Sequence, residues 1–102
     1  MPARTQRVPM HPGEILRDQF MADFQVSINR LARELRVPPT RISDIVNERR
    51  SVTPDTALRL ARYFGTSAEF WINLQISHDL DITRSSLRKI EDRKSTRLNS
   101  SH

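Results

Sequence analysis

The residues best suited to chemistry in this chain form a short polar row between positions 40 and 50. At 100° per residue on a helix, small polar side chains gather opposite three apolar ones, with arginines at the flank and after the end. Such groups both donate and accept hydrogen bonds, as base edges in the DNA major groove require, and nearby cations suit phosphates. An ordinary amphipathic helix with a solvated face fits the same pattern. The candidate base contacts are Thr40, Arg41, Ser43, Asp44 and Asn47.

Two of these residues have more than one interpretation. The carboxylate of Asp44 cannot help with phosphates, but it can accept a hydrogen bond from cytosine N4. It could equally cap the helix or pair with Arg41, three residues earlier. Asn47 comes late in the helix and suits either a base edge or a phosphate. Both alternatives remain open from the sequence.

Two short helices joined by a tight turn must position this row. Ser27 is a typical N-cap, and an apolar face follows at i, i+3, i+4 and i+7 from Ile28. Val37 precedes a proline and should lie outside both helices, while Pro39 suits the first turn of the second. Two helices crossing at a short turn is the plan of the DNA-binding helix-turn-helix, which predicts a recognition helix over 39–48. The expected phosphate contacts are Ser27, Asn29, Arg36, Arg49 and Arg50.

Three further helices are expected around this pair. His11 and Pro12 mark the start of the first, and Thr53 and Pro54 mark another start in the same way. A last helix begins near Ser67. The buried stripe expected after Pro54 is Ala57, Leu58, Leu60, Ala61 and Phe64. The fold class is therefore predicted to be all-α, with five helices and a central helix-turn-helix.

The last helix is apolar around too much of its circumference for one packed face. Part of that surface should meet a second chain, because a two-fold dimer also matches a palindromic operator. The alternative is that all of it packs within the domain. Helical periodicity continues more weakly over 81–91, which we expect to be a helical extension, either continuous with the last helix or loose. The predicted homodimer interface is Phe70, Trp71, Leu74 and Ile76.

Three longer segments carry a resemblance to a known family. They are HPGEILRDQF, SINRLARELRVPPTRISDIVNERR and TPDTALRLARYFGTSAEFWINLQ, within about residues 11–81. They resemble the HigA-type (VapI-type) antitoxins of the Cro/C1 helix-turn-helix family. One departure is Arg36, because such turns often carry glycine there. If Arg36 is left-handed, it costs on the order of 1 kcal/mol.

The resemblance implies a lambda-repressor-like domain and a function. HigA-type antitoxins neutralise a small ribosome-associated, mRNA-cleaving toxin of the RelE-like HigB type, and they repress their own operon by binding double-stranded DNA. Two alternatives stay open. One is a stand-alone repressor without a toxin partner, and the other is an antitoxin that acts chiefly on protein and has vestigial DNA affinity.

Composition limits the remaining classes. The chain has 102 residues and no cysteine, which predicts one small domain without disulfides or thiolate metal sites. Its net charge of +5 favours an anionic partner such as nucleic acid. No run approaches the roughly 20 apolar residues of a membrane span, and the N-terminus is too short and polar for a secretory signal, so we expect a cytoplasmic protein without membrane contact.

The chain is expected to divide into four parts. Residues 1–10 are predicted to be a flexible arm, 11–80 the helix-turn-helix domain and 81–91 the extension. The segment 92–102, DRKSTRLNSSH, shares no pattern with the rest and looks like translated read-through of a sequencing adapter. We expect it to be non-native, although a basic DNA-binding tail is the alternative. Without it, 14 basic and 11 acidic residues give a net charge of +3.

Other chemistry is weakly represented, and neither an enzyme nor a cofactor is expected. His78, Asp79 and Asp81 offer too few ligands on one helix face for a metal site, and a solvated helix end explains them better. His11 and Glu14 are better explained as helix-start residues than as an acid–base pair. With two glycines, the chain has no glycine-rich phosphate loop.

Overall fold

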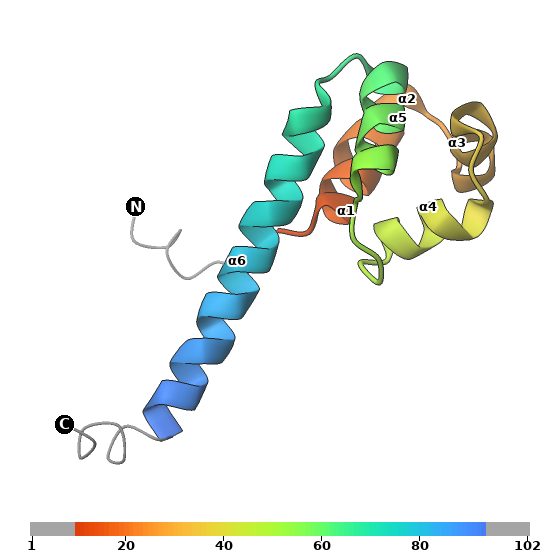
Figure 1. The fold of residues 1–102 in the computed structure, drawn as a ribbon. Helices are drawn as coiled ribbons and strands as arrows, with labels where there is room; N and C mark the ends of the chain where they lie inside the picture. The colour runs from red at the N-terminus through yellow and green to blue at the C-terminus, as the bar shows by residue number, and fades with distance from the viewer. Residues whose placement is uncertain (1–9, 94–102) are drawn as a thin grey trace.

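The computed structural model describes residues 10–93, and there all regular secondary structure is helical (Figure 1). The first helix is continuous through three segments, α1 (Pro12–Ile15), the π-helical η2 (Leu16–Met21) and α2 (Ala22–Phe24). The other four are α3 (Ile28–Leu35), α4 (Pro39–Val46), α5 (Pro54–Phe64) and α6 (Ala68–Arg93). The prediction of an all-α fold with five helices and a central helix-turn-helix is confirmed. The arm expected at 1–10 lies outside the described residues except for Met10. The tail expected at 92–102 lies outside them except for Asp92 and Arg93, which belong to the end of α6.

The helix ends follow from local side-chain chemistry. His11 Nδ1 accepts a hydrogen bond from the Gly13 amide at 2.8 Å, and Ser27 Oγ accepts one from the Arg30 amide at 3.1 Å. Such caps satisfy amides that have no partner inside the helix. At its C-terminal cap, α3 turns through Arg36, whose φ is +61°. An arginine therefore takes a left-handed conformation that glycine adopts without cost.

The core lies where the first helix, α3, α4, α5 and the start of α6 meet. Phe20 lies beside Phe64 and Trp71, with ring centroids 5.2 and 5.0 Å away, and the Trp71 indole donates to Thr66 Oγ1 at 2.8 Å. Burial of this apolar surface is the main stabilising term. The largest fully buried side chains are Trp71, Leu16, Leu31, Ile42, Ile45, Leu60 and Pro12.

Two expectations about burial are wrong. The side chain of Trp71 is fully buried within its own chain, so it belongs to the core and not to a dimer interface. Leu58 is 63% exposed, because one step along a helix rotates it away from buried Ala57 toward solvent.

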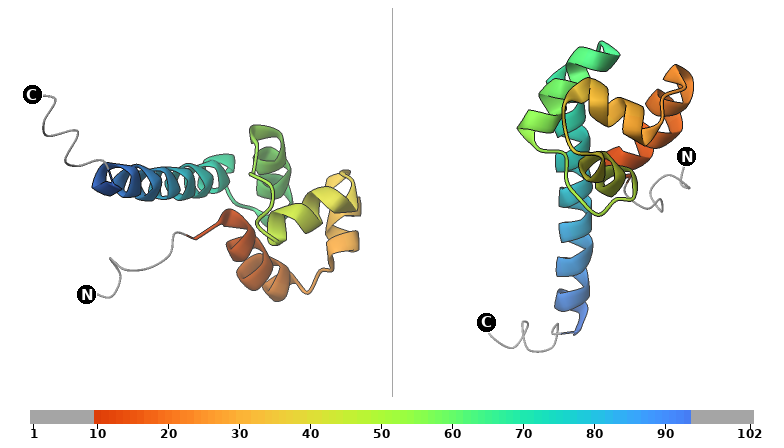
Figure 2. Two further views of the ribbon diagram at one scale, coloured as in Figure 1. Left: turned by 90° about the horizontal axis from the view of Figure 1, so that it is seen from below. Right: turned by 90° about the vertical axis from the view of Figure 1, so that its right-hand side faces the viewer.

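The helix α6 has two different halves. Its first turns pack on α5, and buried Gln75 accepts a hydrogen bond from the Val52 amide at 2.7 Å. Beyond His78, whose ring meets that of His11, α6 continues as one straight helix that projects away from the domain (Figures 1 and 2). The extension at 81–91 is therefore continuous with the last helix and not loose. Within residues 10–93, none of the helices combines the length and the hydrophobicity that a membrane span needs.

Candidate nucleic-acid interface

The N-terminal ends of α3 and α4 meet at one open surface. A shallow hollow of about 460 Å³ lies between them. It is lined by Ser27, Ile28, Asn29, Pro39, Thr40 and Ser43. Two predicted phosphate contacts and two predicted base contacts thus share one surface. Amide groups at helix N-termini favour anions, so such a surface suits a phosphate backbone.

Asn47 lies on the same side of α4, one turn after Ser43. As the C-cap of α4, it donates from Nδ2 to the Ser43 carbonyl at 2.9 Å and lies 3.4 Å from Ser43 Oγ. Its side chain is exposed. The amide oxygen has no hydrogen bond within the described residues, so the polar row ends in an acceptor held in place by Ser43.

The carboxylate of Asp44 lies next to two arginines that follow the helix. Its oxygens are 3.3 Å from Arg49 Nη2 and 3.5 Å from Arg50 Nη2. The chain turns back at Glu48, whose φ is +62°, and the Arg49 amide donates to the Asp44 carbonyl at 2.7 Å. In the free protein Asp44 therefore pairs with these two cations, and the alternative of a pair with Arg41 is wrong.

Arg41 has a different partner. Its Nη1 donates to the Asp55 carboxylate at 2.8 Å, and Arg59 Nε donates to the same oxygen at 3.0 Å. These hydrogen bonds, first that of Arg59 and then that of Arg41, hold the pKa of the Asp55 carboxyl below its usual range. Arg41 does not line the hollow between the helix N-termini. It links the flank of α4 to the first turn of α5.

Arg36 is separated from the other expected phosphate contacts. It caps the C-terminal end of α3, whereas Ser27 caps the N-terminal end. Eight helical residues place these ends about 12 Å apart. The structure thus groups Ser27 and Asn29 at one surface and leaves Arg36 at the other end of the helix.

Two residues of the first helix brace α4, and the sequence-based analysis missed both. A Cβ added to Gly13 would lie 1.7 Å from the Ile45 carbonyl oxygen, so only glycine allows this approach. Arg17 Nη1 donates to the Val46 carbonyl at 2.8 Å. A glycine inside a helical turn was the available signal, because it often marks close approach of another backbone.

A histidine pair joins the start of the first helix to α6. The rings of His11 and His78 meet edge to face, with centroids 4.9 Å apart. The pKa of His11 lies below its ordinary value of 6.5, because burial disfavours the charged ring and His78 adds repulsion. His11 is therefore neutral at pH 7, as its role as acceptor for the Gly13 amide requires.

Comparisons with known proteins agree with this geometry. A helix-turn-helix family model matches residues 24–71. Virulence-associated protein I of Dichelobacter nodosus is 44% identical over 91 residues, covering 88% of this chain and 84% of that protein. The structure of a HigA-family antidote protein from Coxiella burnetii superposes with a TM-score of 0.78 at 42% identity, covering 86% of this chain and 96% of that one. The structure of Pseudomonas aeruginosa antitoxin HigA with the higBA promoter superposes with a TM-score of 0.68 at 41% identity. The match covers 92% of this chain and 95% of that one. With such identity along most of its length and a helix-turn-helix at its centre, the chain belongs to the HigA-type antitoxins of the helix-turn-helix family.

Proposed function

We propose that this protein is the antitoxin of a toxin–antitoxin pair and that it represses its own operon by binding operator DNA as a homodimer. The observation that carries the DNA-binding half is the hollow where Ser27 and Asn29 meet Thr40 and Ser43. Small polar side chains stand there beside two helix N-termini, which combines groups for base edges with groups for phosphates. The P. aeruginosa relative, solved with promoter DNA, supports the same use of this fold.

In this proposal α4 enters the major groove. Thr40, Ser43 and the amide oxygen of Asn47 face base edges, while Ser27 and Asn29 bind phosphate at the start of α3. Arg49 and Arg50 bind phosphates after α4, and this would draw them away from Asp44. The carboxylate thus released could accept from cytosine N4. Arg41 reaches a base only by leaving Asp55.

The second copy is proposed to pack along α6. Four exposed apolar side chains follow each other there at spacings of four, seven and three residues. Thr83 lies between the second and the third of them and divides the interval of seven into three and four. This is the spacing of a coiled-coil seam, and exposed apolar rows of this kind favour association. The row consists of Ile76, Leu80, Leu87 and Ile90, each 41–53% exposed. Of the interface residues expected from sequence, only Ile76 belongs to this row. Phe70 lies against Phe20, with ring centroids 5.9 Å apart, and Leu74 packs against the core of its own domain.

The toxin partner is proposed from the family alone, as a RelE-like HigB-type protein. Because operator DNA and ribosomes lie in the bacterial cytoplasm, this function places the protein there. A neighbouring reading frame whose product co-purifies with the chain would support an antitoxin, whereas absence of such a gene would favour the stand-alone repressor.

The experiment that tests the DNA-binding half is a gel-shift titration against the chain's own upstream region, with a scrambled duplex as control. We expect tight, salt-dependent binding that prefers the upstream region by at least about a thousandfold. Equal affinity for both duplexes at every salt concentration would mean that the polar face of α4 is only a solvated surface. A protein-directed antitoxin with vestigial DNA affinity would then be the better description.

A further inference from the structure

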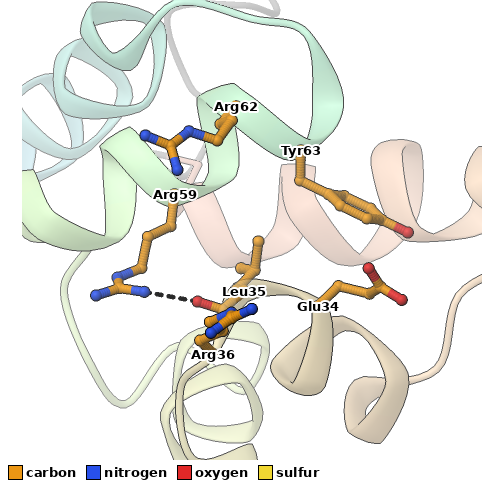
Figure 3. A pocket seen from close by; sticks show the side chains of 6 residues that line it. All are labelled: Glu34, Leu35, Arg36, Arg59, Arg62 and Tyr63. Carbon is orange, nitrogen blue, oxygen red and sulfur yellow. Dashed lines mark hydrogen bonds between the residues drawn. The ribbon is translucent and has the colours of Figure 1, made fainter.

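A second hollow lies at the opposite end of α3 from the proposed DNA surface. It has a volume of about 320 Å³ and lies between the C-terminal end of α3 and the outer face of α5 (Figure 3). It shares no lining residue with the hollow at the helix N-termini. Its lining is Glu34, Leu35, Arg36, Arg59, Arg62 and Tyr63.

Three arginines surround this hollow, but only one of them is engaged. Arg59 Nη1 donates to the Leu35 carbonyl at 2.7 Å, and its Nε donates to Asp55. Arg36 and Arg62 are both exposed, and neither makes a side-chain hydrogen bond or ion pair to the described part of the chain. Two guanidinium groups, each with five donors, therefore remain available at the rim.

The backbone at Arg36 explains how its side chain reaches the rim. Its φ of +61° lies in the left-handed region, where every residue except glycine meets a steric penalty. This turn lets the amides of Arg36 and Val37 donate to the carbonyls of Arg33 and Ala32, which ends α3. The same turn carries the Arg36 guanidinium to the rim of the hollow, where the cation contributes no contact to the described part of the fold.

We propose that this hollow binds an acidic segment of a partner polypeptide, in which a carboxylate stands next to an apolar side chain. The carboxylate pairs with Arg36 and Arg62, because guanidinium groups bind carboxylates in a two-pronged geometry. The apolar neighbour packs on Leu35 and Tyr63. Leu58, which is 63% exposed, extends this apolar contact along α5 in the adjoining hollow that it shares with Arg59 and Arg62.

The position of Glu34 favours a peptide, rather than a nucleic-acid backbone, as the ligand of this hollow. Glu34 lies opposite Tyr63, away from Arg62 (Figure 3). Its carboxylate repels an unbroken row of phosphates, but it accepts hydrogen bonds from peptide amides or a lysine. Because the two ends of α3 are separate, the peptide and operator DNA bind independently. The proposal is therefore independent of the DNA-binding function.

The test uses the full chain as it exists and an array of random eight-residue peptides as the probe. Selected peptides are expected to carry Asp or Glu beside Leu, Phe or Tyr. In NMR titrations the best of them shifts the backbone amides of residues 34–36 and 59–63, and its version with amidated carboxylates does not. Arg36→Gly and Arg62→Ala each weaken binding about tenfold or more, as loss of a charge-assisted hydrogen bond predicts. Arg88→Ala, an equal loss of charge far along α6, leaves peptide affinity unchanged.

Two readouts separate binding from folding. Arg36→Gly removes the backbone strain, so its melting temperature stays equal to or above that of the wild type while its peptide affinity falls. Arg62→Ala keeps the wild-type affinity for operator DNA. The proposal is overturned if the selected peptides lack acidic residues, or if both variants bind them normally. It is also overturned if a short scrambled duplex shifts the same amides with equal affinity.

Discussion

The guanidinium group of Arg17 donates a hydrogen bond to the main-chain carbonyl of Val46 at 2.8 Å, and so closes the C-terminal end of α4. A helix leaves its last carbonyls without internal partners, and a cation there also suits the helix dipole. Gly13, one turn earlier, lies directly against the carbonyl of Ile45. The first helix therefore fixes the position of α4 through contacts to its backbone, which leaves the side chains of α4 free for the proposed DNA contacts.

Gly13→Ala should destabilise the protein by roughly 1–3 kcal/mol, because the added methyl group meets a backbone oxygen that cannot rotate away. Urea denaturation measures the change. Gly65→Ala is the matched control, since a Cβ there meets no atom within 4 Å and loses only the left-handed preference of glycine, about 1 kcal/mol. Equal losses of unfolding free energy at both positions would argue against the close contact between α4 and the first helix.

Thr40→Ala should weaken binding to the operator by roughly 1–3 kcal/mol and leave binding to a scrambled duplex unchanged, because a base contact is sequence-specific. Gel-shift titrations of both duplexes give the two values. Ser85→Ala, which removes an exposed hydroxyl from the projecting part of α6 on the face opposite the apolar row, is the control for stability and handling. A parallel loss on both duplexes would make Thr40 a backbone contact.

Arg49→Ala should weaken binding to all sequences alike, because phosphate contacts carry no sequence information. Each lost phosphate contact lowers the slope of log K against log salt by about one unit. Titrations at several salt concentrations measure this slope. If Arg49→Ala leaves the slope as it is in the wild type, the arginine serves only as a partner for Asp44.

Acidification should lower stability through His11. The folded pKa of His11 lies below the ordinary 6.5, because burial and His78 disfavour its charged form, while nearby Glu48 and Asp79 oppose this in part. As the pH falls through 6.5, the unfolded chain binds a proton that the folded chain does not, so stability is lost until the folded pKa is passed. Urea denaturation between pH 7.5 and 5 should show this loss. His11→Asn keeps an acceptor for the Gly13 amide and should flatten the profile.

Leu80→Glu should convert a dimer into a monomer, because a charge would be buried in the proposed seam along α6. Sedimentation equilibrium measures the mass, and Trp71 fluorescence reports that the core is intact. Leu58→Glu is the control, since Leu58 is also exposed but lies on α5. A dimer that survives Leu80→Glu would place the interface elsewhere.

The helices and their ends could be predicted from sequence because the signals are local. Ser27, Thr53 and Pro54 stand where the caps and first turns require them, and the apolar spacing in α3 identifies its buried face. The polar face of α4 followed from the same geometry. Local rules could not predict which apolar residues of α6 face their own domain. Trp71 points inward because it packs on Phe20 and donates a hydrogen bond to Thr66, and both contacts depend on how the helices pack.

The partners of the charged residues also could not be predicted from the sequence. A spacing of three residues made Arg41 a reasonable partner for Asp44, yet Arg41 binds Asp55, 14 positions later, and Asp44 pairs with arginines brought back by the turn at Glu48. The Arg17–Val46 contact spans 29 positions and involves a backbone carbonyl. Such contacts depend on how whole helices cross, and helix periodicity carries no information about that.

The length of α4 limits how much genetic information one copy can read. Eight residues span about 12 Å, and base pairs rise by about 3.4 Å, so one helix covers some three to four base pairs. A word that short recurs by chance about every 64 to 256 base pairs. A single copy therefore could not distinguish one site in a genome from its many chance copies. Pairing along α6 doubles the length of the recognised sequence and squares the average distance between its chance occurrences. The helix farthest from the proposed DNA surface would therefore determine whether that surface can recognise a unique operator.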